Sequence, residues 1–171
     1  MNVYEAIKTR RSVRSYQDRP VDKEVLERIL EAARMAPSGN NRQAYKFVVV
    51  TDKEIRKQLA IAAHNQHFVA EAPVVIAAVG LTPEKIMRCG IPADPVDVAI
   101  AIDHITLAAV EEGLGTCWIG AFEQEEVCKI LNIPSQYKVI ELLTLGYPAN
   151  SGPRQKYRKP MEELVCYQKF S

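Results

Sequence analysis

The pattern of hydrophobic positions predicts several helices, of which the clearest spans residues 21–35. Its apolar side chains recur three or four positions apart, at Val25, Leu26, Ile29, Leu30 and Ala33. This spacing is typical of an amphipathic helix that buries one face. Pro37, Ser38 and Gly39 follow, and residues of these types commonly end a helix. Weaker patterns predict further helices over residues 2–8, 52–63, 64–71 and 123–132.

Residues 98–110 (VAIAIDHITLAAV) differ, because they are apolar around most of the helical circumference. Such a helix is expected to be buried on nearly all sides, either inside a domain or between subunits. The preceding residues 81–95 contain three prolines and a glycine. They are therefore expected to form a mobile loop.

Four apolar runs are predicted to be strands, over residues 45–50, 73–80, 116–122 and 137–146. The connections between them are long enough for crossovers, so a sheet covered by helices on both faces is expected. No repeat or linker divides the chain, and residues 1–171 are expected to form one domain. Residues 147–171 have little core of their own, and a partner subunit is one candidate for the surface on which they pack.

The composition is that of a globular protein, with 47% hydrophobic and 25% charged residues. A net charge of +1 argues against a general nucleic-acid binder. The N-terminus lacks the apolar region of a signal peptide, and the four cysteines form no CxxC pair. The most apolar run, residues 72–81, is about half as long as a membrane-spanning helix. We therefore expect a cytoplasmic protein with no membrane or nucleic-acid partner.

Positive charge is concentrated at the two ends of the chain. Arg10, Arg11 and Arg14 have no acidic residue among them. The tail carries Arg154, Lys156, Arg158 and Lys159. The two segments could converge on one anion, because guanidinium groups match phosphate oxygens in pairs. The alternative is that all of these are solvated surface charges.

Other kinds of site find little support. The chain has no GxxxxGK[ST] motif and no GxGxxG after a strand. His64 and His67 lack a third ligand at zinc spacing, so no metal site is expected. Cys117 lacks a setting that would activate a thiol, and no Ser/His/Asp set is evident. If the protein is an enzyme, a cofactor must supply the reactive atoms.

Four motifs then occur in order, RRSVRSY, APSGNNRQ, GLGTCWIGAF and RKPMEELV. Together they resemble the nitroreductase family of FMN-dependent oxidoreductases over nearly the whole chain. The resemblance implies an α+β fold, a three-layer sandwich in which helices flank a central mixed, mainly antiparallel sheet. It also implies a homodimer with FMN at the subunit interface and with the C-terminal tail, residues 147–171, exchanged between subunits.

The resemblance further implies which residues hold FMN. The phosphate and ribityl chain would be bound by side chains from both ends of the sequence, Arg10, Arg11, Ser12, Lys156 and Arg158. Arg14 would approach the pyrimidine edge of the ring, where a cation stabilises the charge of the reduced flavin.

Other implied residues surround the flavin ring. A loop of the other subunit would contact it through Pro37, Ser38, Gly39 and Asn41. Asn65 would hydrogen-bond to the ring. The backbone of Ile119, Gly120 and Ala121 would pass it, with an N–H near N5, and Gly120 would keep side-chain atoms out of the way.

The implied function is ping-pong hydride transfer from NADH or NADPH, through flavin N5, to a nitroaromatic, quinone or similar small electron-poor acceptor. No side chain would need to act as a catalytic acid or base. Alternatives are a non-catalytic flavin-binding or storage protein, a dehalogenase or flavin-modifying relative on the same fold, and a binder of other anions.

One segment departs from the family pattern, and another matches no pattern that identifies a substrate. Ala44 and Tyr45 stand where many members have Pro-Trp, and Tyr45 keeps an aromatic residue at the strand entrance. Residues 82–95 should lie near the substrate face, but they match no single substrate. Within them, Met87, Arg88 and Cys89 are expected either to line the pocket or to cover it.

Overall fold

The computed structural model describes residues 1–150 and 156–170. Among these residues, no helix combines the length and the apolar composition needed to cross a membrane.

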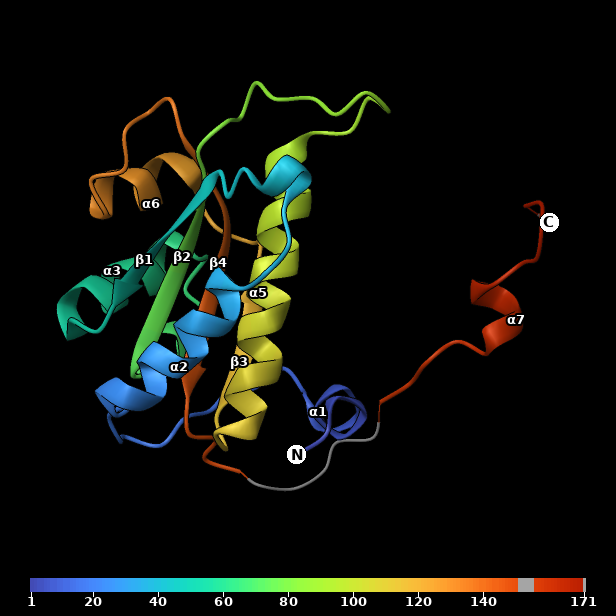
Figure 1. The fold of residues 1–171 in the computed structure, drawn as a ribbon. Helices are drawn as coiled ribbons and strands as arrows, with labels where there is room; N and C mark the ends of the chain where they lie inside the picture. The colour runs from blue at the N-terminus through green and yellow to red at the C-terminus, as the bar shows by residue number, and fades with distance from the viewer. Residues whose placement is uncertain (151–155, 171) are drawn as a thin grey trace.

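Four strands form the central sheet, in the order β1-β2-β4-β3 (Figure 1). They are β1 (Tyr45–Val50), β2 (Val74–Gly80), β3 (Gly115–Ile119) and β4 (Lys138–Gly146). Each neighbouring pair is antiparallel, and the register places Ile76 opposite both Val49 and Leu143. An isolated bridge between Ser12 and Thr116 adds a parallel pairing. The sheet is therefore mainly antiparallel, as predicted.

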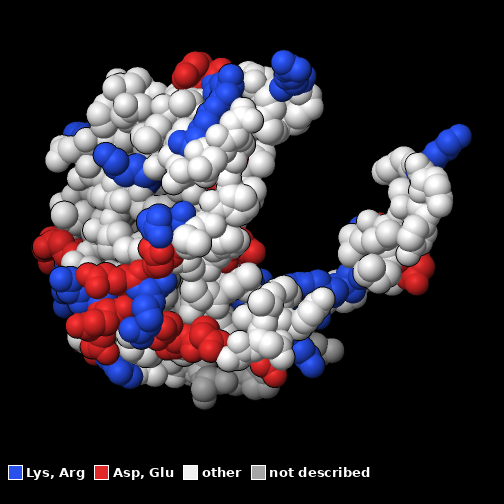
Figure 2. Space-filling view, in the orientation of Figure 1, with Lys and Arg blue, Asp and Glu red and all other residues white. Residues whose placement is uncertain are grey.

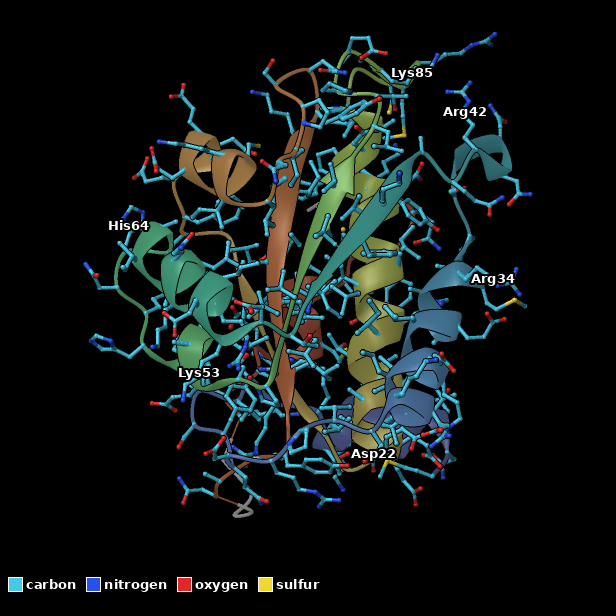
Figure 3. The ribbon with its side chains drawn as sticks, turned by 90° about the vertical axis from the view of Figure 1, so that its left-hand side faces the viewer. Asp22, Arg34, Arg42, Lys53, His64 and Lys85 are labelled. Carbon is cyan, nitrogen blue, oxygen red and sulfur yellow. The ribbon has the colours of Figure 1, made fainter. Side chains whose placement is uncertain are left out.

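Helices cover both faces of this sheet (Figures 1 and 3). On one face lie α2 (Lys23–Arg34) and α5 (Ala93–Glu111), and on the other α3 (Lys53–Ala62), α4 (Phe68–Glu71) and α6 (Gln124–Ile130). Neighbouring residues of β4 belong to separate hydrophobic cores, with Leu143 on the α5 side of the sheet and Leu142 on the α3 side. All of β2 is buried, which explains its uninterrupted apolar run. The predicted three-layer α+β sandwich is confirmed.

Helix α5 begins at Ala93, so the prediction of a loop through residue 95 was wrong. Pro95 lies in the first turn, where a backbone N–H has no partner within the helix and proline is tolerated. The buried side chain of Asp94 anchors this turn, since its carboxylate accepts from the Thr82 N–H at 2.8 Å and the Thr82 hydroxyl at 2.5 Å.

The faces of α5 are not equally covered. Val98, Ile102 and Ile105 are fully buried against the sheet and α2. Leu107 is only half-buried, and Val96 is exposed. Burial on nearly all sides is therefore not achieved within the described chain.

Two short helices flank α5 at opposite ends (Figure 1). Helix α1 (Val3–Thr9) packs near its C-terminal end, where the Met1 ammonium pairs with Glu111 at 2.6 Å. The 3-10 helix η1 (Gly39–Asn41) lies near its N-terminal end, where the Gly39 N–H donates to Asp97 at 3.0 Å.

Residues 156–170, which include α7 (Met161–Leu164), extend away from the body as an arm (Figure 1). Its large side chains are exposed, among them Tyr157, Met161, Leu164, Tyr167 and Phe170. A soluble protein normally covers so many apolar side chains. Within the described residues nothing covers these, and the exchange of the tail between subunits stays a prediction.

We expect Gly80→Ala to destabilise the fold. A Cβ at Gly80 would overlap the carboxyl group of Asp94 and so disturb its anchor to Thr82. Overpacking of this kind costs about 1–3 kcal/mol in the free energy of unfolding, measurable by urea denaturation. Gly39→Ala is the matched control, because its Cβ would meet the Asp97 oxygens at an ordinary 3.9 Å. An equal loss in both variants would contradict the role given to Asp94.

Candidate functional site

The N-terminal arginine segment lies along the outer edge of β3. The Val13 N–H donates to the Thr116 carbonyl at 2.8 Å, so the backbone of Thr116 faces this edge. Because strand residues alternate, the backbone groups of Trp118 face the same way, and Gly120 follows directly after the strand ends at Ile119. The segment that carries Arg14 and the turn after β3 therefore share one open edge of the sheet.

A cluster of cations forms where the arm leaves the body. The Lys156 ammonium donates to the carbonyl of Lys8, at the end of α1, at 2.6 Å. Partial burial, with the like charges of Arg10 and Arg158, lowers the pKa of Lys156. In residues 1–150 and 156–170, no ion pair involves these three cations. Like charges held together without a carboxylate suit the binding of an anion.

The other predicted cations take separate positions. Arg11 donates to the backbone carbonyl of Asn150, which ties the N-terminal segment to the start of the tail. Arg14 and Ser12 lie near Cys117 on β3: burial raises the pKa of this thiol, while the Arg14 charge and the Ser12 hydroxyl lower it. The net rise fits the inert cysteine that the sequence predicted. Arg154 lies outside the described residues.

Gly120 and Ala121 follow β3 and meet the segment after α3. A Cβ at Gly120 would stand 4.0 Å from the nearest atom, Oε2 of Glu141, so internal packing does not require glycine here. Gln66 donates to the Ala121 carbonyl at 3.2 Å, which places the neighbouring Asn65 beside this turn. Asn65 has a left-handed φ of 59°, so the helix predicted over residues 64–71 is restricted to α4.

Glu141 is a site residue that the sequence reasoning missed. It lies on β4 beside the end of β3, and burial raises the pKa of its carboxyl to about 7, while the Ile119 N–H opposes the rise. The available signal was a lone acid within the apolar strand VIELLTLG. A carboxyl group with this pKa changes charge near neutral pH.

The loop Pro37–Asn41 is not brought to these residues. It lies by η1 at the opposite end of α5 from α1 and the cation cluster (Figure 1). With 19 residues, α5 is roughly 28 Å long at about 1.5 Å per residue. Within one chain, the length of α5 therefore separates this loop from the arginines with which it was predicted to share a ligand.

Comparison with known proteins identifies the family to which this fold belongs. The sequence model of the nitroreductase family matches residues 7–73 and 60–147. The chain belongs to the nitroreductase family.

Individual relatives agree with this assignment. The chain is 36% identical over 163 residues to a "Putative NADH dehydrogenase/NAD(P)H nitroreductase" of Methanothermobacter thermautotrophicus, covering 92% of this chain and 83% of that one. It is 32% identical over 179 residues to "FMN reductase [NAD(P)H]" of Bacillus subtilis, covering 95% and 72%. A crystal structure of a nitroreductase family protein from Clostridium difficile 630 superposes with a TM-score of 0.88 at 34% identity, covering 99% and 100%.

We expect Glu141→Gln to change how stability depends on pH. The folded-state pKa of about 7 exceeds the value near 4.5 of an unfolded glutamate, so the folded wild type binds the proton more tightly. Wild-type stability therefore falls relative to the variant as pH rises from about 4.5 to 7, and the difference levels off above 7. After allowance for solvent screening of a half-buried group, the full difference is about 1–2 kcal/mol. Urea denaturation across this range measures it, and a pH-independent difference would show that Glu141 titrates normally.

Proposed function

We propose that this chain is an FMN-dependent oxidoreductase that uses NADH or NADPH to reduce a small electron-poor acceptor, such as a nitroaromatic compound or a quinone, in two alternating half-reactions. When bound, FMN supplies the atom that takes up and delivers hydride. The residues of the chain bind and orient the reactants. The similarity to the FMN reductase [NAD(P)H] of Bacillus subtilis supports both the cofactor and the electron donor.

The observation that carries this proposal is the cation cluster beside an open sheet edge. Arg10, Lys156 and Arg158 lie together without a carboxylate partner in the described residues, which suits the phosphate of FMN. At the same edge, Gly120 presents backbone without side-chain atoms. The residues present thus fit both a phosphate and a flat ring that needs close approach of backbone.

Several of the predicted residues have separate tasks in the proposed function. Ser12 adds a hydroxyl donor next to the arginines, and Arg11 fixes the N-terminal segment to Asn150. With FMN bound, Arg14 would place a positive charge near the ring, where negative charge develops on reduction. The Gly120 N–H would help to orient the reacting edge of the ring. No acid or base is required from the chain, since solvent can supply the proton.

A homodimer completes the site. The loop Pro37–Asn41 lies at the far end of α5 from the cations of its own chain, and a second copy can supply it to the ligand. The exposed apolar side chains of the arm and the half-covered face of α5 are consistent with a partner surface. In this assembly the arm of each subunit packs on the other.

The first experiment tests cofactor and turnover together. Absorption spectroscopy of the purified protein should show a flavin, released by heat as FMN at about one per chain. Anaerobic NADH or NADPH should bleach the flavin bands, and a nitroaromatic acceptor or a quinone should restore them. A protein that holds FMN but is not bleached would be a flavin-binding protein without this activity, and a protein that takes up no FMN would contradict the proposal entirely.

We expect Arg158→Gln to weaken FMN binding by about tenfold, because it removes a charge-assisted contact with the phosphate. Equilibrium dialysis with fluorescence detection of free FMN measures the change. The matched control is Lys159→Gln, because Lys159 pairs with Glu163 on its own arm at 3.4 Å. Equal retention of FMN in both variants would remove Arg158 from the phosphate site.

A further inference from the structure

A cavity of about 600 Å³ opens at the N-terminal end of α5. Its walls come from η1 and the residues after it, from the loop after β2 and from the first turn of α5. Its lining includes Gly39, Arg42, Lys85, Met87, Arg88 and Asp97. Its volume lies within the range of about 300–1,000 Å³ that is usual for small-molecule sites. Of the three residues expected to line or cover a pocket, Met87 and Arg88 line this one, while Cys89 does not.

The charged side chains of this cavity are mostly cationic. Arg42, Lys85 and Arg88 line it, and Figure 3 shows Arg42 and Lys85 at the same end of the molecule, on separate segments. Asp97 is the one acid in the lining, and its carboxylate already accepts from the Gly39 N–H at 3.0 Å. The nearby Asp94 is buried and bonded to Thr82. With three cations and one acid in its lining, the cavity has an excess of positive charge.

These three cations differ from most exposed cations on the helices. Arg34 pairs with Glu31 at 2.6 Å, and Lys57 pairs with Glu54 at 2.8 Å. In the described part of the chain, no ion pair involves the cations of the cavity. In the space-filling view, Lys and Arg side chains lie over this upper end of the molecule, beside a smaller acidic patch (Figure 2).

The loop that carries two of these cations is held by its own backbone. The Met87 N–H donates to Ile91 at 2.8 Å, and the Ala93 N–H donates to Lys85 at 2.9 Å. These hydrogen bonds join the two sides of the segment, and its predicted mobility stays a prediction. Ile86 and Met87 add an apolar wall beside the charges. The combination suits an aromatic or other flat body that carries an acidic group.

We propose that this cavity binds the anionic group, carboxylate or phosphate, of a substrate through Arg42, Lys85 and Arg88. The proposal deepens the proposed function and rests on it, since Gly39 belongs both to this cavity and to the loop expected to reach FMN. The anion has two possible sources, the electron acceptor or the 2′-phosphate that distinguishes NADPH from NADH. A neutral substrate of the same shape would bind more weakly than the anion in either case.

The first part of the test varies the electron acceptor. It compares 4-nitrobenzoate with 4-nitrobenzamide at saturating NADH, using the FMN-loaded protein. The wild type should have a lower KM for the acid than for the amide, and salt should reduce the difference. In the variant Lys85→Gln/Arg88→Gln, and separately in Arg42→Gln, the ratio of the two KM values should move toward one by about three- to tenfold. Lys53→Gln is the control, because Lys53 lies on α3 across the sheet from the cavity (Figure 3), and it should keep the wild-type ratio.

The second part of the test varies the electron donor. It compares NADPH with NADH in the same variants, at a saturating concentration of a neutral acceptor. A loss of NADPH preference with no change in the nitrobenzoate ratio assigns the cavity to the nucleotide phosphate. The reverse result assigns it to the acceptor. If the wild type shows no preference for the anionic compound in either part of the test, the inference is overturned, although the reductase activity stands.

A binding measurement separates this inference from the proposed function. Calorimetric titration of the purified protein with 4-aminobenzoate and 4-aminobenzamide needs no turnover. Tighter binding of the acid, lost in Lys85→Gln/Arg88→Gln but kept in Lys53→Gln, supports the cavity even in a protein with no reductase activity. Equal binding of acid and amide overturns the inference whatever the activity is.

Discussion

Helix α5 sets the distance between the two groups of residues that the proposed site requires. It is a rigid helix of 19 residues, tied to α1 at one end through Met1 and to η1 at the other through Asp97. A helix cannot shorten to bring these ends together, because its rise of about 1.5 Å per residue is fixed by its hydrogen bonds. The Arg10 cluster and the Pro37–Asn41 loop therefore cannot meet on one ligand within one chain.

Two-fold symmetry resolves this separation in the proposed dimer. If the loop of one subunit reaches the cations of the other, the reverse contact must also form, because the same surfaces meet in both directions. Two equivalent sites follow from one interface. The long apolar helix then has two roles, since one face completes the core of its own subunit through Ile102 and the other, through Leu107, is free to meet the partner.

The sequence predicted the parts of the fold that depend on local pattern. β1 and β2 match the predicted apolar runs closely, because Thr51 ends the first run, Pro73 begins the second and β2 is buried on both faces. The start of α5 was missed, since Pro95 suggests a loop until the anchoring of Asp94 by Thr82 is known. That contact joins residues 12 positions apart across a loop, so no helical or strand periodicity could indicate it.

The candidate site likewise depends on contacts that the local sequence pattern does not indicate. Motif resemblance named Arg10 and Lys156, and their proximity depends on how α1 and the arm meet, which only the tertiary structure reveals. Glu141 was missed because an acid in a strand usually faces water, whereas this one is partly buried beside the end of β3.

The net charge of the whole chain does not show how the charge is distributed, and this distribution matters most for binding. The total of +1 reflects 22 basic and 21 acidic residues, and some of the acids lie on helices away from the two clusters, as Glu31 does beside Arg34. What remains is a positive cluster at each end of α5, around Lys156 and around Lys85. If the first is occupied by the FMN phosphate, its charge is largely neutralised. The second then keeps its charge for an incoming substrate, so cofactor and substrate do not compete for the same cations.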